Sequence, residues 1–255
     1  KDNLKISGNG KIKIDKDFDN INYLISKKNN KINFDLNLDL NETVFQISQL
    51  NFKKEKKSNS QLKISGIFEK NNNFILNNLT IFEKENNIQI RNLVLGKDNL
   101  IVGLDKAIFN YVDSENKLNF FQIIKKEKNI YDISGLNLNA NNLVSNLLKD
   151  NTDKKNEIFK NDIKLILNID EVFIDEVYFV KKLKGSVYIQ DNKVLNASIL
   201  ANFKNKDNIA FTIYKDQQGN KITTLTSSWA KPLINRYKFI EGFEDGYLDF
   251  RSSKK

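Results

Sequence analysis

Strict alternation of apolar and polar residues is the feature of this sequence that most restricts its fold. In residues 31–40 every second residue is apolar, and the residues between are Lys, Asn or Asp. Because successive side chains of a β-strand point to opposite faces, this pattern predicts a strand with one apolar and one hydrated face. The positions on the apolar face are Ile32, Phe34, Leu36, Leu38 and Leu40.

The same period of two recurs along most of the chain, to about residue 124 and again from residue 163. Clusters of Lys, Asn, Glu and Ser separate these segments and are typical of solvated hairpin turns. The pattern predicts an all-β protein, a long antiparallel meander in which nothing of βαβ type is visible. Further positions on the apolar face are Leu62, Ile64, Ile163, Leu165, Leu167, Ile209, Phe211, Ile213, Leu248 and Phe250.

Two short stretches change to a helical period. Leu143, Val144, Leu147 and Leu148 fall on one helical face, and a polar linker follows them to about residue 160. The second helix is expected at about 229–239, where Pro232, the only proline, suits the first turn because N–H groups there have no intrahelical partner. We therefore divide the chain into a β segment (1–135), a helix with linker (136–160) and a second β segment (161–255).

Composition removes several chemistries. The chain contains no Cys and no His, which excludes disulfides, thiolate nucleophiles, Cys/His zinc sites and imidazole bases. The formal net charge of +9 comes almost entirely from Lys, and we expect no nucleic-acid partner, because such surfaces interleave basic residues with exposed aromatic ones. The chain also lacks Met and any apolar run of membrane length, so we interpret it as an internal piece of a longer or processed protein.

Two short motifs suggest chemistry but fit simpler interpretations. Ser228 and Lys231 have the S-x-x-K spacing of serine acyl enzymes, without the accompanying S-D-N and K-T-G elements. Residues 15–19 carry Asp at the first three spacings of a calcium loop, but Asn20 replaces the required glycine and Ser26 the required glutamate. We interpret this second motif as a solvated turn.

Charged clusters are interpreted as solvated turns as well. Glu241, Glu244 and Asp245 form an acidic helix-to-strand turn rather than an acid/base pair. The lysine clusters are spaced like hairpin tips, although contact with anionic lipid head groups is an alternative. They occupy residues 53–57, 125–128 and 181–184. We predict no catalytic, cofactor-binding or metal-binding residue, and no enzymatic activity.

The second half of the chain resembles the AsmA-like proteins of Gram-negative bacteria, in the branch of very large, envelope-spanning members. Two stretches carry the resemblance: GLNLNANNLVSNLL, a glycine and short helix before a run of strands, and SSWAKPLINRYKFIEGFEDGYLDF, a helix with a hydrophobic end, a glycine turn and a strand. Gly242 and Gly246 supply the turn, whereas the family commonly has two adjacent glycines there. The resemblance covers about residues 135–250, and the first half shares only the alternating pattern.

The resemblance implies a curled antiparallel sheet, an open β-groove whose concave apolar face shields lipid acyl chains. It also implies a periplasmic location, an inner-membrane anchor outside this sequence, and a role in phospholipid transport between the inner and outer membranes and in envelope assembly. The expected ligand is phospholipid, and the fifteen apolar positions named above are the expected groove residues. The alternative is a closed structural β-sandwich of the envelope without lipid cargo, in which a second layer covers every apolar strand face.

Overall fold

The structure, a computed structural model, describes residues 3–69, 74–143, 159–203, 207–237 and 245–254. Nearly all of its regular structure is β-strand, which confirms the all-β class. The chain forms two compact units. Unit 1 comprises Lys1–Lys125 with Asp153–Lys160, and unit 2 comprises Lys126–Thr152 with Asn161–Lys255. Each unit is built on hydrogen-bonded strands that are mostly antiparallel.

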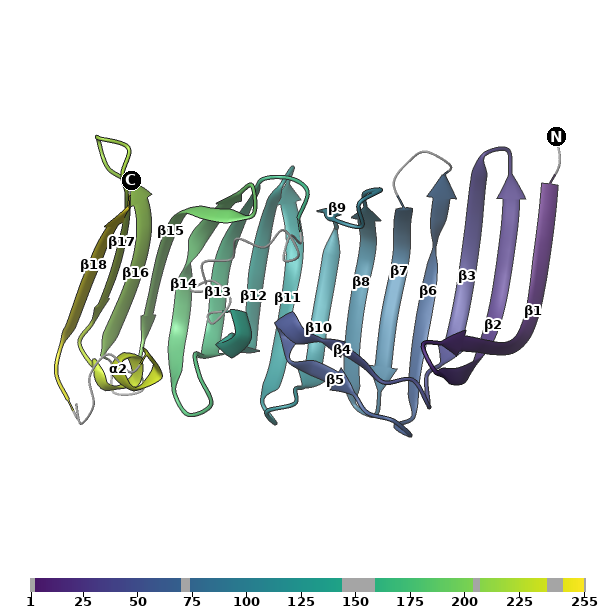
Figure 1. Cartoon of the computed structure of the whole chain (residues 1–255), viewed down its shortest axis with the longest axis horizontal. Coiled ribbons are helices and arrows are strands. Elements are labelled where there is room, and N and C mark those ends of the chain that lie inside the picture. The colour runs from purple at the N-terminus through teal and green to yellow at the C-terminus, as the bar shows by residue number, and fades with distance from the viewer. Residues whose placement is uncertain (1–2, 70–73, 144–158, 204–206, 238–244, 255) are drawn as a thin grey trace. The chain divides into compact units, whose positions relative to one another are not determined.

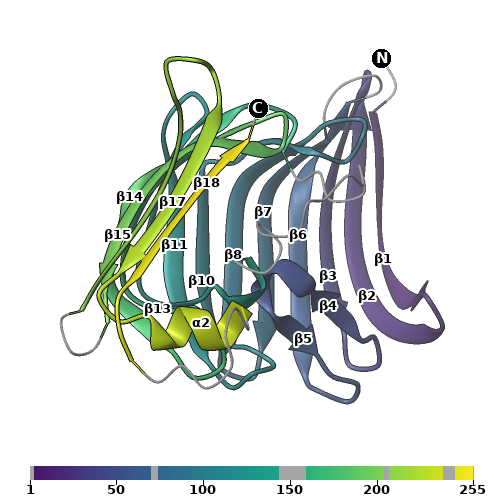
Figure 2. The ribbon, with the colours of Figure 1, turned by 60° about the vertical axis from the view of Figure 1, so that its left-hand side comes forward.

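Unit 1 is a row of antiparallel strands, seen side by side in Figure 1. A separate two-stranded sheet, β4 (Phe45–Ile47) with β5 (Phe52–Lys54), encloses a short 3-10 helix, η1 (Ser48–Leu50). In both views this hairpin crosses the row near one end of the strands (Figure 2). The row runs β1 (Asn3–Ile14), β2 (Asp17–Lys28), β3 (Lys31–Asp39), β6 (Ser60–Glu69), β7 (Phe74–Glu83), β8 (Asn86–Leu95), β10 (Lys106–Val112) and β11 (Leu118–Glu127), with β9 (Ile101–Gly103) pairing β8.

Unit 2 has a second row of strands and one helix, α2 (Lys231–Tyr237). Its first two strands, β12 and β13, are parallel, and all later neighbours are antiparallel. The strands are β12 (Ile130–Asn139), β13 (Ile163–Phe173), β14 (Phe179–Gln190), β15 (Lys193–Asn202), β16 (Asn208–Lys215), β17 (Lys221–Ser227) and β18 (Leu248–Lys254).

The parallel pair corrects the prediction of a purely antiparallel meander with nothing of βαβ type. Two parallel neighbours cannot be joined by a tight hairpin, so the chain must return along the sheet in a crossover connection. The two strands are separated by residues 140–162, of which the described ones include helical residues at 141–143. The predicted helix residues Val144, Leu147 and Leu148 lie outside the described residues. Alternation could not reveal the crossover, because it reports which face a side chain occupies and not the direction of its strand.

The helix predicted at about 229–239 is confirmed for its described part, with Pro232 in the first turn. Its residues Leu233 and Ile234 are buried. Trp229, just before the helix, meets the ring of Phe203 edge-on with 5.1 Å between ring centroids. Phe203 belongs to the buried cluster of unit 2, together with Ala140, Ile169, Val172, Val180 and Ala201. The helix is therefore attached to the sheet by apolar packing.

A polar contact fixes the other end of α2. The guanidinium of Arg236 donates to the side-chain oxygen of Asn141 at 2.8 Å and to its carbonyl at 3.0 Å. It also donates to the carbonyl of Ile174. A charged donor shared by backbone carbonyls is among the stronger hydrogen bonds in proteins, so Arg236 ties the helix to the crossover segment and to the β13–β14 turn.

Candidate functional site

The predicted groove residues on β3 and β6 lie on one face of the sheet of unit 1, and Leu40 directly follows the end of β3. Leu36 is directly opposite Tyr23 on β2 and Ile64 on β6, and Leu38 is opposite Leu62. Residues directly opposite in neighbouring strands share a face, so the ladder places these side chains in continuous rows. We call this surface apolar face 1; its members include Ile21, Tyr23, Ile25, Ile32, Phe34, Leu36, Leu38, Leu62, Ile64, Leu79, Ile81 and Ile88.

Glycine shapes one point of apolar face 1. Gly66 lies opposite both Phe34 and Leu76. A Cβ added at Gly66 would come within 2.3 Å of the Ile75 carbonyl oxygen and 2.6 Å of the Phe34 ring. The missing side chain therefore makes room for the Phe34 ring, which stacks on Phe74 with 5.2 Å between ring centroids.

The predicted residues of unit 2 also share a face. Leu167 is opposite Gly185, which is opposite Ile199, and the row continues to Phe211 and then Leu225. We call this surface apolar face 2. Its predicted members are Ile163, Leu165, Leu167, Ile209, Phe211, Ile213, Leu248 and Phe250.

Most of the predicted residues are neither fully buried nor fully exposed. Leu38, Leu40, Ile163 and Ile213 are buried, Phe250 is 40% exposed, and the other ten are half-buried. The opposite faces are less uniformly polar than the alternation indicated, and they carry exposed residues such as Leu24, Phe120 and Leu200. Isolated apolar side chains on a hydrated surface are common, so these exceptions leave the assignment of the two apolar faces unchanged.

Residues 41–59, which comprise the β4–β5 hairpin and its flanks, form a flap that packs on the strand row of unit 1. Phe52 is fully buried, and the Tyr111 ring meets it edge-on with 5.5 Å between centroids. The Tyr111 hydroxyl donates to the Leu50 carbonyl at 2.7 Å, and burial, with a smaller contribution from Asp113, raises the pKa of that phenol. Among the described residues, the flap is the only second sheet found in unit 1.

Beneath the flap lies a buried polar cluster. The Asp19 carboxylate accepts the backbone N–H groups of Glu42 and Thr43, each at 2.9 Å. The Lys54 ammonium, fully buried, donates to the carbonyls of Asn41 at 2.9 Å and Thr43 at 2.8 Å. Burial of Asp19 alone would raise its pKa, but the backbone donors outweigh it and the pKa falls below its usual value. Burial lowers the pKa of Lys54.

These two residues correct the interpretation of residues 15–19 and 53–57 as solvated turns. Asp19 is buried in β2 at a position whose neighbours on the same face, Ile21 and Tyr23, are apolar. Lys54 follows Phe52 by two residues on β5. A charged residue at an apolar position of the alternation was the signal that sequence reasoning missed, because such a residue must find polar partners when it is buried.

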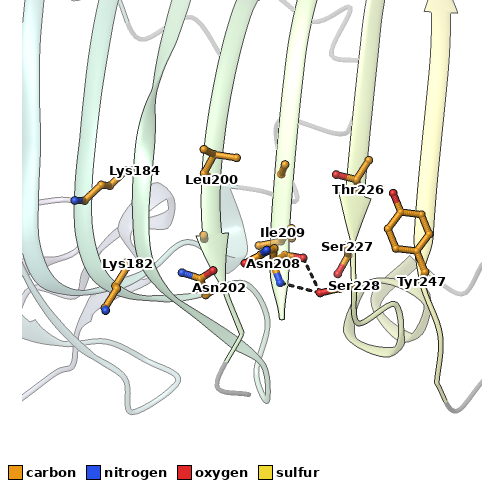
Figure 3. A pocket seen from close by; sticks show the side chains of 12 residues that line it. Lys182, Lys184, Leu200, Asn202, Asn208, Ile209, Thr226, Ser227, Ser228 and Tyr247 are labelled. Atoms are coloured by element: carbon orange, nitrogen blue, oxygen red, sulfur yellow. Dashed lines mark hydrogen bonds between the residues drawn. The ribbon is translucent and has the colours of Figure 1, made fainter. Parts of the chain in front are cut away.

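A hollow opens in unit 2 (Figure 3). It has a volume of about 610 Å³ and lies between the ends of β14–β17 and the start of β18. Its wall includes Lys182, Lys184, Leu200, Thr226 and Tyr247. Lys184 is opposite Leu200, so both side chains lie on the face opposite apolar face 2. The lysine cluster 181–184 is therefore part of β14, and its interpretation as a hairpin tip was wrong.

The remaining motifs acquire no catalytic arrangement. The Ser228 hydroxyl donates to the Asp207 carboxylate at 3.2 Å and accepts the Asn208 backbone N–H at 2.8 Å. Glu241 and Glu244 lie outside the described residues. Within the described ranges, no group of three or more acidic side chains is placed to hold a metal ion. In the same ranges, no helix has the length and apolar character needed to cross a membrane.

Comparison with protein-family models, with curated proteins and with solved structures finds no significant match.

Proposed function

We propose that apolar faces 1 and 2 shelter the acyl chains of phospholipid, and that the chain is a periplasmic segment of an AsmA-like protein that supports phospholipid transport between the inner and outer membranes. The observation that carries the proposal is the in-register alignment of apolar side chains on one face of each sheet, with ten of the fifteen predicted residues still half-buried. Such surfaces are only partly shielded from water, and a lipid would complete their burial.

Energetics support an apolar track of this kind. Two acyl chains contain roughly thirty methylenes, and exposing each to water costs about 0.8 kcal/mol, or roughly 24 kcal/mol in total. A carrier needs a continuous apolar surface that removes most of this cost, and it needs no catalytic residue. The proposal includes an open, curled groove and an anchor in the inner membrane supplied by other parts of the protein.

The experiment is native mass spectrometry of the gently purified chain, followed by lipid extraction. We expect co-purified phospholipid that is lost in Leu36→Asp and in Leu165→Asp, because a charge within an apolar track is costly to desolvate against an acyl chain. The matched controls, Asn33→Asp and Ile166→Asp, place a carboxylate on the opposite face of the same strands and should retain the lipid.

Circular dichroism must show that all four variants are folded. A lipid-free, monodisperse and stably folded wild-type chain would contradict the proposal and favour a structural role without cargo. Lipid retained equally in the Leu36→Asp, Leu165→Asp and control variants would also contradict it, because the lipid would then not depend on the apolar faces.

A further inference from the structure

Part of the wall of the hollow in unit 2 lies on the face opposite the proposed acyl-chain surface. One row of directly paired residues runs across it, from Lys184 to Leu200, Ala210 and Thr226. All four residues line the hollow. Successive side chains along a strand point to opposite faces of the sheet, so the side chains of this row point away from apolar face 2. Ile209, a member of apolar face 2, also lines the hollow, so the hollow reaches the edge of that surface and the inference deepens the proposed function, on which it rests.

Two lysines of β14 lie on this surface beside a β-bulge. The pairing of β14 with β15 shifts register between Lys181 and Lys184, and Lys182 has a φ of 52°. Lys182 and Lys184 are two residues apart in β14 and both line the hollow. Lys181 lies near the Glu171 carboxylate at 3.9 Å.

Among the described residues, no carboxylate lines the hollow. Asp170 lies on β13 between the partners of Lys181 and Leu183, Asp249 is opposite Thr226, and the Asp207 carboxylate accepts the Ser228 hydroxyl. Within the described ranges, Lys182 and Lys184 have neither an ion pair nor a hydrogen bond from their side chains. Two unpaired ammonium groups facing one hollow repel each other, and an anion placed between them would relieve that repulsion.

The rest of the wall combines apolar area with hydrogen-bond donors. Leu200 is 60% exposed and Tyr247 is 63% exposed, so each offers uncovered carbon surface beside the lysines. The hydroxyls of Thr226 and Tyr247 and the side-chain amide of Asn202 have no partner among the described residues, and each is able to donate to an anionic oxygen. The volume of about 610 Å³ lies in the usual range for small-molecule sites.

We propose that this hollow binds a phosphate-bearing amphiphile. The phosphate lies between the ammonium groups of Lys182 and Lys184, the first carbons of its apolar part lie against Leu200, and the rest of that part extends along the hollow toward Tyr247. The shared chemistry is that of a phosphate monoester or diester, supplied either by a lipid head group or by free phosphate. The exposed Leu200 and Tyr247 favour the lipid source, because free phosphate leaves their apolar surface uncovered.

The test is titration calorimetry of the full 255-residue chain with dihexanoyl phosphatidate as a monomer. Lys182→Gln/Lys184→Gln should weaken binding by about tenfold or more, because charge-assisted hydrogen bonds are roughly twice as strong as neutral ones. The matched control Lys164→Gln/Lys193→Gln removes two exposed lysines of the same unit outside the hollow and should bind as the wild type does. Leu200→Ser should weaken the short-chain lipid and leave inorganic phosphate unaffected.

The proposal is overturned by no binding, by equal loss in the Lys164/Lys193 control, or by inorganic phosphate binding as tightly as the lipid. The Leu36→Asp variant separates this site from the acyl-chain surface, because it should lose co-purified lipid yet bind dihexanoyl phosphatidate normally. Loss of calorimetric binding in folded Leu36→Asp would assign the lipid to apolar face 1 and refute the separate site.

Discussion

Replacement of Phe52 by alanine should release the flap from unit 1. The Phe52 side chain is fully buried, and its ring lies 5.5 Å from the Tyr111 ring and 5.7 Å from the Phe45 ring, measured between centroids. Truncation of a buried phenylalanine to alanine costs about 3–5 kcal/mol, since it combines lost transfer free energy with a cavity. We expect a loss in this range, because removal of the Phe52 ring leaves a cavity beside the Tyr111 and Phe45 rings.

The loss can be measured by urea unfolding followed by circular dichroism. With an m-value of about 2 kcal/mol per molar urea, a loss of about 4 kcal/mol lowers the midpoint by about 2 M. The matched control is Phe18→Ala, because Phe18 is 57% exposed on β2 and its truncation should change stability by about 0.5 kcal/mol or less. Amide hydrogen exchange should accelerate in residues 41–59 of the Phe52 variant.

A different result would refute this reasoning. If Phe52→Ala costs no more than Phe18→Ala, and exchange in the flap is unchanged, the buried rings do not hold the flap. If exchange in the flap is already fast in the wild-type chain, the polar cluster beneath it does not protect the backbone either.

Three further predictions concern single residues. Gly66→Ala should destabilise the chain by about 1–3 kcal/mol in urea unfolding, because the added Cβ would meet backbone atoms. Gly10→Ala should not, because no atom lies within 4 Å of its added Cβ, and equal effects of the two substitutions would contradict this. Asp19→Asn should lower the free energy of unfolding by about 1–3 kcal/mol at pH 7. The difference from the wild type should shrink as the pH falls through the lowered pKa of Asp19, because the protonated wild-type residue loses the same stabilisation, and a pH-independent difference would refute this. Leu233→Ala should red-shift the fluorescence of Trp229, the single tryptophan, because weaker packing of α2 exposes the indole to water. An unchanged emission maximum would show that the packing of α2 does not depend on Leu233.

The strands and their apolar faces could be predicted from the sequence because burial of one face of a sheet imposes a period of two on the residues. Leu36 and Ile64 are more than twenty residues apart, yet each belongs to an alternating segment, and the structure pairs them on one face. The direction of a strand leaves no such trace. The parallel pairing of β12 with β13 was consequently missed, although a change of period at 136–160 marked the crossover.

The sequence by itself determined an all-β chain, two sets of one-sided strands and the helix that begins near Pro232, because each depends on residues close together in the chain. Only the tertiary structure decided which polar residues are buried and which polar residues from different segments lie in one place. Asp19 accepts N–H groups from residues 42 and 43, and Lys182 and Lys184 line the same hollow as Tyr247, which is more than sixty residues away in the sequence. Such contacts join segments that are far apart in the sequence, and no local pattern indicates that these segments will meet. The pairing of strands and the packing of the flap bring them together.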